Sequence, residues 1–179
     1  KKRILKDYSV SEEKIIVIPN GVDEDVFAHK WRGQESNYML YAGRIEKYKK
    51  LDEAIKLSKK MNLKLTILGQ GPYKEKLRKK AEKLYSNGVE FEDFLPRQKY
   101  LEILANARYA INLSDKEAYS IFIAEALAIG TPSITSKTIA ETLSASYDLI
   151  EGKSNAFILR SMQIFSWAQI VDVLTSSVY

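Results

Sequence analysis

The feature that most constrains the fold is an alternation of short apolar runs with longer amphipathic stretches along the 179 residues. The apolar runs predict strands over residues 15–18, 38–42, 64–68, 89–91, 109–113 and 133–135. The stretches between them predict helices over residues 51–61, 73–85, 98–106 and 121–129, with a last helix over about 166–179. Strands that alternate with helices predict one α/β domain over residues 1–179, Rossmann-like and three-layered, in which helices cover both faces of a mainly parallel sheet.

The composition excludes several classes of function. The chain has no cysteine and a single histidine, His29, so neither a disulfide framework nor a cysteine- or histidine-rich metal site is expected. No apolar run reaches the roughly 18 residues of a membrane span, and a cytoplasmic location is therefore expected. The net charge of +5 is compatible with nucleic acid, anionic lipid or phosphorylated ligands. The lysines mostly alternate with glutamates, however, which is typical of solvated helix faces.

Glycine, charged and hydroxyl residues follow four of the predicted strands. The loops concerned are residues 43–50, 69–72, 92–96 and 114–120. The carboxyl ends of parallel strands lie at one edge of a sheet, and ligands of such sheets bind at that edge. The sequence therefore predicts that these four loops converge on a binding site.

Two basic residues in the first of these loops suit an anionic ligand. Arg44 follows Gly43 at a strand end, and Lys49 precedes the next helix. An arginine can bind phosphate with two parallel hydrogen bonds, a lysine adds a point charge, and a helix N-terminus strengthens both. The pair predicts a diphosphate site, although two solvated basic residues remain the alternative. The loop that begins at Gly69 is weaker support, because a tight turn alone explains its glycines.

A lone carboxylate in an apolar helix is the most specific signal. Glu125 is the only charged residue between Ile121 and Ile129, in a helix that Ser120 should begin and Gly130 should end. A buried carboxylate needs partners. These partners are either a basic residue or backbone amides of the protein, or two neighbouring ligand hydroxyls such as those of a ribose. Glu117, in the loop before the helix, would then face the other end of the ligand.

These residues match a known family. Glu117 and Glu125 form a Glu-x7-Glu motif, followed by Ala-Leu-Ala-x-Gly-Thr-Pro over residues 126–132. Further matches, in family order, lie at residues 17–23, 43–49, 68–72 and 165–167. The ordered set resembles the C-terminal, donor-binding half of the retaining GT-B glycosyltransferases of family 4, the glycosyl transferases group 1. The chain differs from the family at Tyr119-Ser120, where Phe-Gly is usual, and at Lys50, where a glycine is common.

The resemblance implies roles for named residues. Glu117, Arg44 and Lys49 would form the catalytic set, with the two cations on the diphosphate and Glu117 facing the donor sugar. Glu125 would bind the ribose, and the backbone of Phe94 and Leu95 would lie near the base. The implied donor-binding set is Gly43, Arg44, Lys49, Gly69, Phe94, Leu95, Tyr119, Ser120, Ile121 and Glu125.

The resemblance also implies an activity. The family transfers a hexose from a nucleotide diphosphate sugar with retention, in polysaccharide or glycoconjugate synthesis, and needs no metal or other cofactor. A UDP- or GDP-sugar is the expected donor. The expected partner is an N-terminal acceptor domain, toward which the last helix would pack and without which this domain would be inactive. Contact with the cytoplasmic face of a membrane fits such enzymes. Two alternatives remain: a related nucleotide-sugar epimerase, and a basic nucleic-acid-binding module, which the lack of a basic-aromatic platform disfavours.

Overall fold

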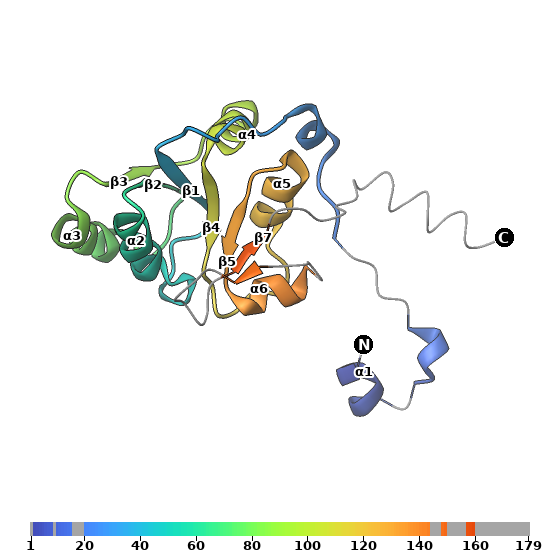
Figure 1. The fold of residues 1–179 in the computed structure, drawn as a ribbon. Coiled ribbons are helices and arrows are strands. Elements are labelled where there is room, and N and C mark those ends of the chain that lie inside the picture. The colour runs from blue at the N-terminus through green and yellow to red at the C-terminus, as the bar shows by residue number, and fades with distance from the viewer. Residues whose placement is uncertain (1, 9, 16–19, 144–147, 150–156, 160–179) are drawn as a thin grey trace.

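The structure is a computed structural model that describes residues 2–8, 10–15, 20–143, 148–149 and 157–159 (Figure 1). Its described strands form one seven-stranded sheet in the order β3-β2-β1-β4-β5-β7-β6. The strands are β1 (Tyr38–Ala42), β2 (Lys64–Leu68), β3 (Val89–Glu92), β4 (Tyr109–Asn112), β5 (Ser133–Thr135), β6 (Asp148–Leu149) and β7 (Phe157–Leu159). Strands β1 to β5 pair in parallel, whereas β7 is antiparallel to both β5 and β6.

Helices connect the parallel strands. The α-helices are α1 (Lys2–Asp7), α2 (Leu51–Lys60), α3 (Lys74–Tyr85), α4 (Arg97–Asn106), α5 (Ile121–Ile129) and α6 (Lys137–Thr142). The 3-10 helices are η1 (Glu12–Lys14), η2 (Glu24–Ala28) and η3 (Lys47–Lys49). Successive residues of a strand point to opposite faces, so Met39 and Tyr41 pack with α2 and α3 while Leu40 packs with α4 and α5. Two buried apolar clusters therefore lie on the two faces of the sheet, and the domain has three layers (Figure 1).

The predicted fold class is confirmed. Five of the six predicted strands and four of the five predicted helices are present, each within one residue at both ends. Of the sixth strand, residues 15–18, only Ile15 is described, and it belongs to no strand. The predicted helix over residues 166–179 lies outside the described residues. The sequence did not predict β6, β7, α1, α6 or the 3-10 helices.

The strand order positions the site. The chain runs outward from β1 through β2 to β3 and then returns to β4 on the other side of β1. Connections that leave β1 and β4 in opposite directions open a crevice beyond their carboxyl ends, where ligands of doubly wound sheets bind. The loops after β1 and β2 meet at this edge, as the sequence predicted. Backbone hydrogen bonds join Gly43 N to Leu68 O at 3.0 Å and Ile45 N to Gln70 O at 2.8 Å.

Gly69 shows why these two loops require glycine. Its φ is +139°, a conformation that side chains rarely adopt, and a Cβ placed there would lie 2.0 Å from the carbonyl oxygen of Gly43. The loops after β1 and β2 therefore touch backbone to backbone. Gly69 has a structural reason to be glycine that does not depend on a ligand.

Candidate functional site

A pocket of about 280 Å³ lies at the carboxyl edge of the sheet. It is lined by Ala42, Gly43, Leu68, Asp93, Phe94, Leu95, Arg97 and Tyr100. These residues come from the ends of β1 and β2, from the loop after β3, and from the first turn of α4. The pocket therefore lies where the strand order predicts a ligand. Five of its residues were not in the expected donor-binding set: Ala42, Leu68, Asp93, Arg97 and Tyr100.

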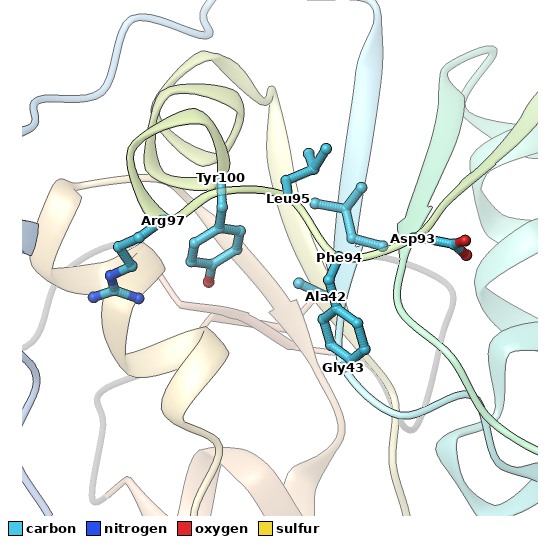
Figure 2. Close-up of a pocket in the computed structure, with 8 residues that line it drawn as sticks. Ala42, Gly43, Asp93, Phe94, Leu95, Arg97 and Tyr100 are labelled. Carbon is cyan, nitrogen blue, oxygen red and sulfur yellow. The ribbon is translucent and has the colours of Figure 1, made fainter.

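The loop after β3 forms one wall of this pocket. Phe94 is 81% exposed although it is a large apolar side chain, and Leu95 is half-buried. Figure 2 shows the rings of Phe94 and Tyr100 on either side of the pocket, with the Asp93 carboxylate directed away from both. Asp93 pairs with the amine of Lys74, which also donates to Gly69 O at 3.2 Å. The ion pair ties this wall to the glycine turn after β2.

Glu125 is buried at 5% exposure and has both carboxylate oxygens occupied by donors from α4. Arg97 Nη1 donates to Oε1 at 2.5 Å, and the Tyr100 hydroxyl donates to Oε2 at 2.5 Å. The protein thus supplies partners for this carboxylate, as one of the two alternatives from the sequence predicted. The pKa of Tyr100 is raised well above its ordinary value by burial and by the adjacent Glu125 charge, so its hydroxyl stays protonated and remains a donor.

Arg97 connects three segments of the chain. Its Nε and Nη2 atoms donate to the two oxygens of Asp25, both at 3.0 Å, and Asp23 lies 3.6 Å from Nη2. The hydrogen bonds from Arg97 lower the pKa of Asp25, although partial burial opposes them. The η2 segment, α4 and α5 are therefore joined through one guanidinium. One cation faces three carboxylates, so this end of the site carries an excess of negative charge.

The opposite end of the site contains two cations, Arg44 and Lys49, each paired with a carboxylate. Lys49 Nζ lies 2.5 Å from Glu117 Oε2, and both side chains are largely buried. Arg44 is mostly exposed and contacts Glu46 at 3.0 Å. Asp115 N donates to Tyr48 O at 3.3 Å, which joins the loop after β4 to the loop after β1. The structure thus brings Lys49 to Glu117, whereas Arg44 pairs with Glu46 near the surface.

The start of α5 lies between the two glutamates in the sequence. Ser120 Oγ accepts from Ile123 N at 3.4 Å and from Asn112 Nδ2 at 3.1 Å, which confirms Ser120 as the N-cap. Backbone amides at a helix start have no intrahelical acceptor. Ile121 is 54% exposed there and Tyr119 is half-buried, whereas Ser120 is buried.

Sequence reasoning missed Arg97, Tyr100 and Asp25 as site residues. The signal available for the first two was their position, since both follow a predicted strand at the edge where the other loops converge. Asp25 carried no such signal, because it comes from η2, far from the strand-end loops in the sequence.

A doubly wound α/β domain with a pocket at its strand-end crevice is the class that fold and site define. The profile of the family described as glycosyl transferases group 1 matches residues 23–145, more than half of the chain. This chain belongs to that family.

A curated relative is the GDP-mannose-dependent alpha-(1-6)-phosphatidylinositol dimannoside mannosyltransferase of Mycobacterium tuberculosis. It is 27% identical over 142 residues, which cover 71% of this chain and 36% of that protein. The chain therefore spans about a third of the length of the curated relatives that it matches.

Two solved structures share the fold. HepE of Anabaena, crystallised with UDP-glucose, has a TM-score of 0.63 at 17% identity, over 94% of this chain and 49% of that chain. The C-terminal domain of the group 1 glycosyl transferase LpcC from Francisella tularensis has a TM-score of 0.58 at 20% identity, over 87% of each chain.

Within the described residues, no group of three or more histidine, cysteine, aspartate or glutamate side chains could hold a metal ion. Among the helices that the structure describes, none is long and apolar enough to cross a membrane.

Proposed function

We propose that this domain binds the nucleotide diphosphate sugar of a glycosyltransferase that transfers a hexose with retention and without a bound metal. The observation that carries the proposal is the charge layout of the strand-end site. Two cations, Arg44 and Lys49, lie after β1, each paired with one carboxylate, and a carboxylate held by Arg97 and Tyr100 lies beside the pocket at α4 and α5. A nucleoside diphosphate has the complementary layout, with anionic phosphates at one end and donating ribose hydroxyls at the other.

Arg44 and Lys49 are the proposed diphosphate ligands. Lys49 uses one donor for Glu117 and has two left, and Arg44 is exposed enough to turn its planar guanidinium onto phosphate oxygens. When the bond between sugar and diphosphate breaks, negative charge grows on the departing phosphate. Two cations placed there stabilise that charge and can fulfil the role that a divalent metal has in other transferases.

The other proposed contacts follow from the same orientation. Glu125 would accept the ribose hydroxyls, and the excess of carboxylates around Arg97 would repel a phosphate from that end. The base would enter the pocket beside Phe94 and Leu95, with Gly43 and Gly69 shaping the loops beneath the phosphates. Glu117 and the amides of residues 119–121 would contact the donor sugar.

The donor base is either uracil or guanine in this proposal. The mycobacterial relative is GDP-mannose-dependent, and the Anabaena structure contains UDP-glucose. The acceptor would bind to an N-terminal domain, in keeping with the share of the relatives that this chain spans. The protein would work in the cytoplasm or at the cytoplasmic face of a membrane.

Calorimetric titration of the 179-residue chain with UDP-glucose, GDP-mannose and ADP-glucose tests the proposal. At least one nucleotide sugar should bind, equally well with and without a chelator. Arg44→Ala and Lys49→Ala should each lower the affinity about tenfold, because each removes a charge-assisted contact. Lys60→Ala, an exposed lysine at the far end of α2, is the matched control and should change nothing.

Equal binding by wild type and both basic-residue variants would contradict the proposed diphosphate site. Binding to random oligonucleotides that weakens steeply with salt would instead support a nucleic-acid-binding module. In the full-length protein, conversion of a nucleotide sugar to its epimer without transfer to an acceptor would support the epimerase alternative.

A further inference from the structure

The way Glu125 is held goes beyond what neutralising a buried charge requires. One bond from Arg97 would pair the charge, yet Tyr100 adds a second donor on the other oxygen. Both donors come from the first turn of α4, and both side chains also line the pocket. Figure 2 shows them projecting from the same turn, with the Tyr100 ring between Arg97 and the rest of the pocket.

Two donors, one on each oxygen, fix the plane of a carboxylate. A carboxylate has about four lone-pair positions, so two remain for a ligand. With the plane fixed, these two positions have a defined direction and spacing. Two hydroxyls on neighbouring carbons, such as the 2′ and 3′ hydroxyls of a ribose, can donate to both together, whereas a carboxylate free to rotate would first have to be ordered.

Arg97 is itself fixed. Asp25 receives both Nε and Nη2, so the guanidinium plane is set by η2 before its remaining nitrogen, Nη1, reaches Glu125. Asp25 thus orients Arg97, and Arg97 in turn orients Glu125. The Tyr100 hydroxyl completes it from the pocket side.

We propose that Arg97 and Tyr100 are positioning residues that hold the Glu125 carboxylate so that it receives both hydroxyls of a nucleotide ribose. This inference rests on the proposed function, in which Glu125 contacts the ribose. The positioning role differs from a purely structural role in one measurable respect. Loss of the Tyr100 hydroxyl should weaken only those ligands that possess the ribose hydroxyls.

Nucleotide pairs that differ only in the ribose provide the test. The 179-residue chain is titrated with UDP and GDP and with the 2′,3′-dideoxy form of each. Wild type should bind the ribose form at least about tenfold more tightly than the dideoxy form, because hydrogen bonds to a charged group contribute about that much affinity. Tyr100→Phe keeps the ring and removes the hydroxyl. It should reduce that preference at least about fivefold while leaving the affinity for the dideoxy form unchanged.

The matched control is Tyr38→Phe. The Tyr38 hydroxyl donates to Ile103 O of the same helix at 2.7 Å, but Tyr38 does not line the pocket. Its removal should leave the ribose preference at the wild-type value. Arg97→Lys, which keeps the charge but loses the planar fork, should reduce the preference as Tyr100→Phe does. Circular dichroism shows whether each variant is folded.

The outcomes separate this inference from the function on which it rests. If wild type binds neither nucleotide, or binds ribose and dideoxy forms equally, the ribose contact of Glu125 is refuted and the inference falls with it. If wild type prefers ribose but Tyr100→Phe keeps the full preference, or weakens both forms equally, the positioning role is refuted and the ribose contact stands.

Discussion

Replacement of Glu125 by alanine should lower the free energy of unfolding by about 3–5 kcal/mol. The side chain is buried, and its two oxygens accept hydrogen bonds from Arg97 and Tyr100 at 2.5 Å each. Alanine removes the acceptor of both donors and leaves a space in the first turns of an otherwise apolar helix. The loss should be large for a single substitution, because it combines three separate effects.

The magnitude follows from the burial of each partner. The Tyr100 hydroxyl, deep in the site, loses a bond to a charged acceptor, which costs about 1.5–3 kcal/mol. Arg97 is 35% exposed and keeps Asp25, so solvent screening limits its loss to about 1 kcal/mol. The shortened side chain gives up buried methylene contacts, which contribute about 1 kcal/mol more.

Urea unfolding followed by circular dichroism measures the change. Glu53→Ala is the matched control, since Glu53 is an exposed helical glutamate paired with Lys56 at 2.9 Å, and it should change stability by less than about 0.5 kcal/mol. Glu125→Gln should fall between the two, because its amide oxygen still accepts one bond. A loss for Glu125→Ala no larger than that of Glu53→Ala would refute the argument that the protein holds this carboxylate.

Four further outcomes are expected. Gly69→Ala should lower the free energy of unfolding by at least about 3 kcal/mol in urea, because its φ of +139° and the Gly43 carbonyl both exclude a Cβ. Gly88→Ala should lower it less, because the added carbon meets the Tyr85 ring, which can move. Lys50→Gly should stabilise by about 0.5 kcal/mol, since Lys50 has a left-handed φ of 53°, and Asn62→Gly at the same φ should gain less, because asparagine adopts that conformation more readily than lysine does. Asp25→Asn should lower stability at pH 7, and its difference from wild type should shrink as the pH falls below about 4. A carboxylate whose pKa is lowered by folding stabilises the protein only above its unfolded pKa, and this stabilisation is lost as the carboxylate protonates. A stability difference that is constant with pH would contradict this. Glu117→Gln should tighten binding of a nucleoside diphosphate about threefold in calorimetry, because it releases Lys49 and removes a repelling charge, and weaker binding would contradict the proposed role of Lys49.

The sequence was a good guide to the fold because the signals involved are local. Strands buried on both faces read as continuous apolar runs, and α5 begins and ends where Ser120 and Gly130 predicted. Gly130 has a left-handed φ of 92°, which explains why a glycine ends this helix. Strands β6 and β7 have two and three residues, and α6 has six, which is too short for periodicity to distinguish them from loops.

The site was less predictable because its decisive contacts join residues distant in the sequence. That Glu125 needed partners followed from its apolar neighbours alone. The identity of those partners did not, since Tyr100 and Arg97 lie 25 and 28 residues away and reach Glu125 only once α4 packs beside α5. The ion-pair alternative is present in the structure, and the ribose contact stays a prediction. The contact between Lys49 and Glu117 was missed for the same reason, because 68 residues separate them.

The two glutamates of the Glu-x7-Glu motif are each held by a basic residue that follows a different strand. Lys49, after β1, holds Glu117, and Arg97, after β3, holds Glu125. The eight-residue spacing places one carboxylate before the N-terminus of α5 and the other within its second turn. Without a ligand, the inner charges are therefore paired within the protein, and Arg44, largely exposed, is the cation best able to respond to an arriving diphosphate. In our proposal Arg44 would bind the phosphates. The two paired carboxylates, already fixed in direction, would accept hydrogen bonds from the donor sugar and from the ribose, which lie on either side of the phosphates.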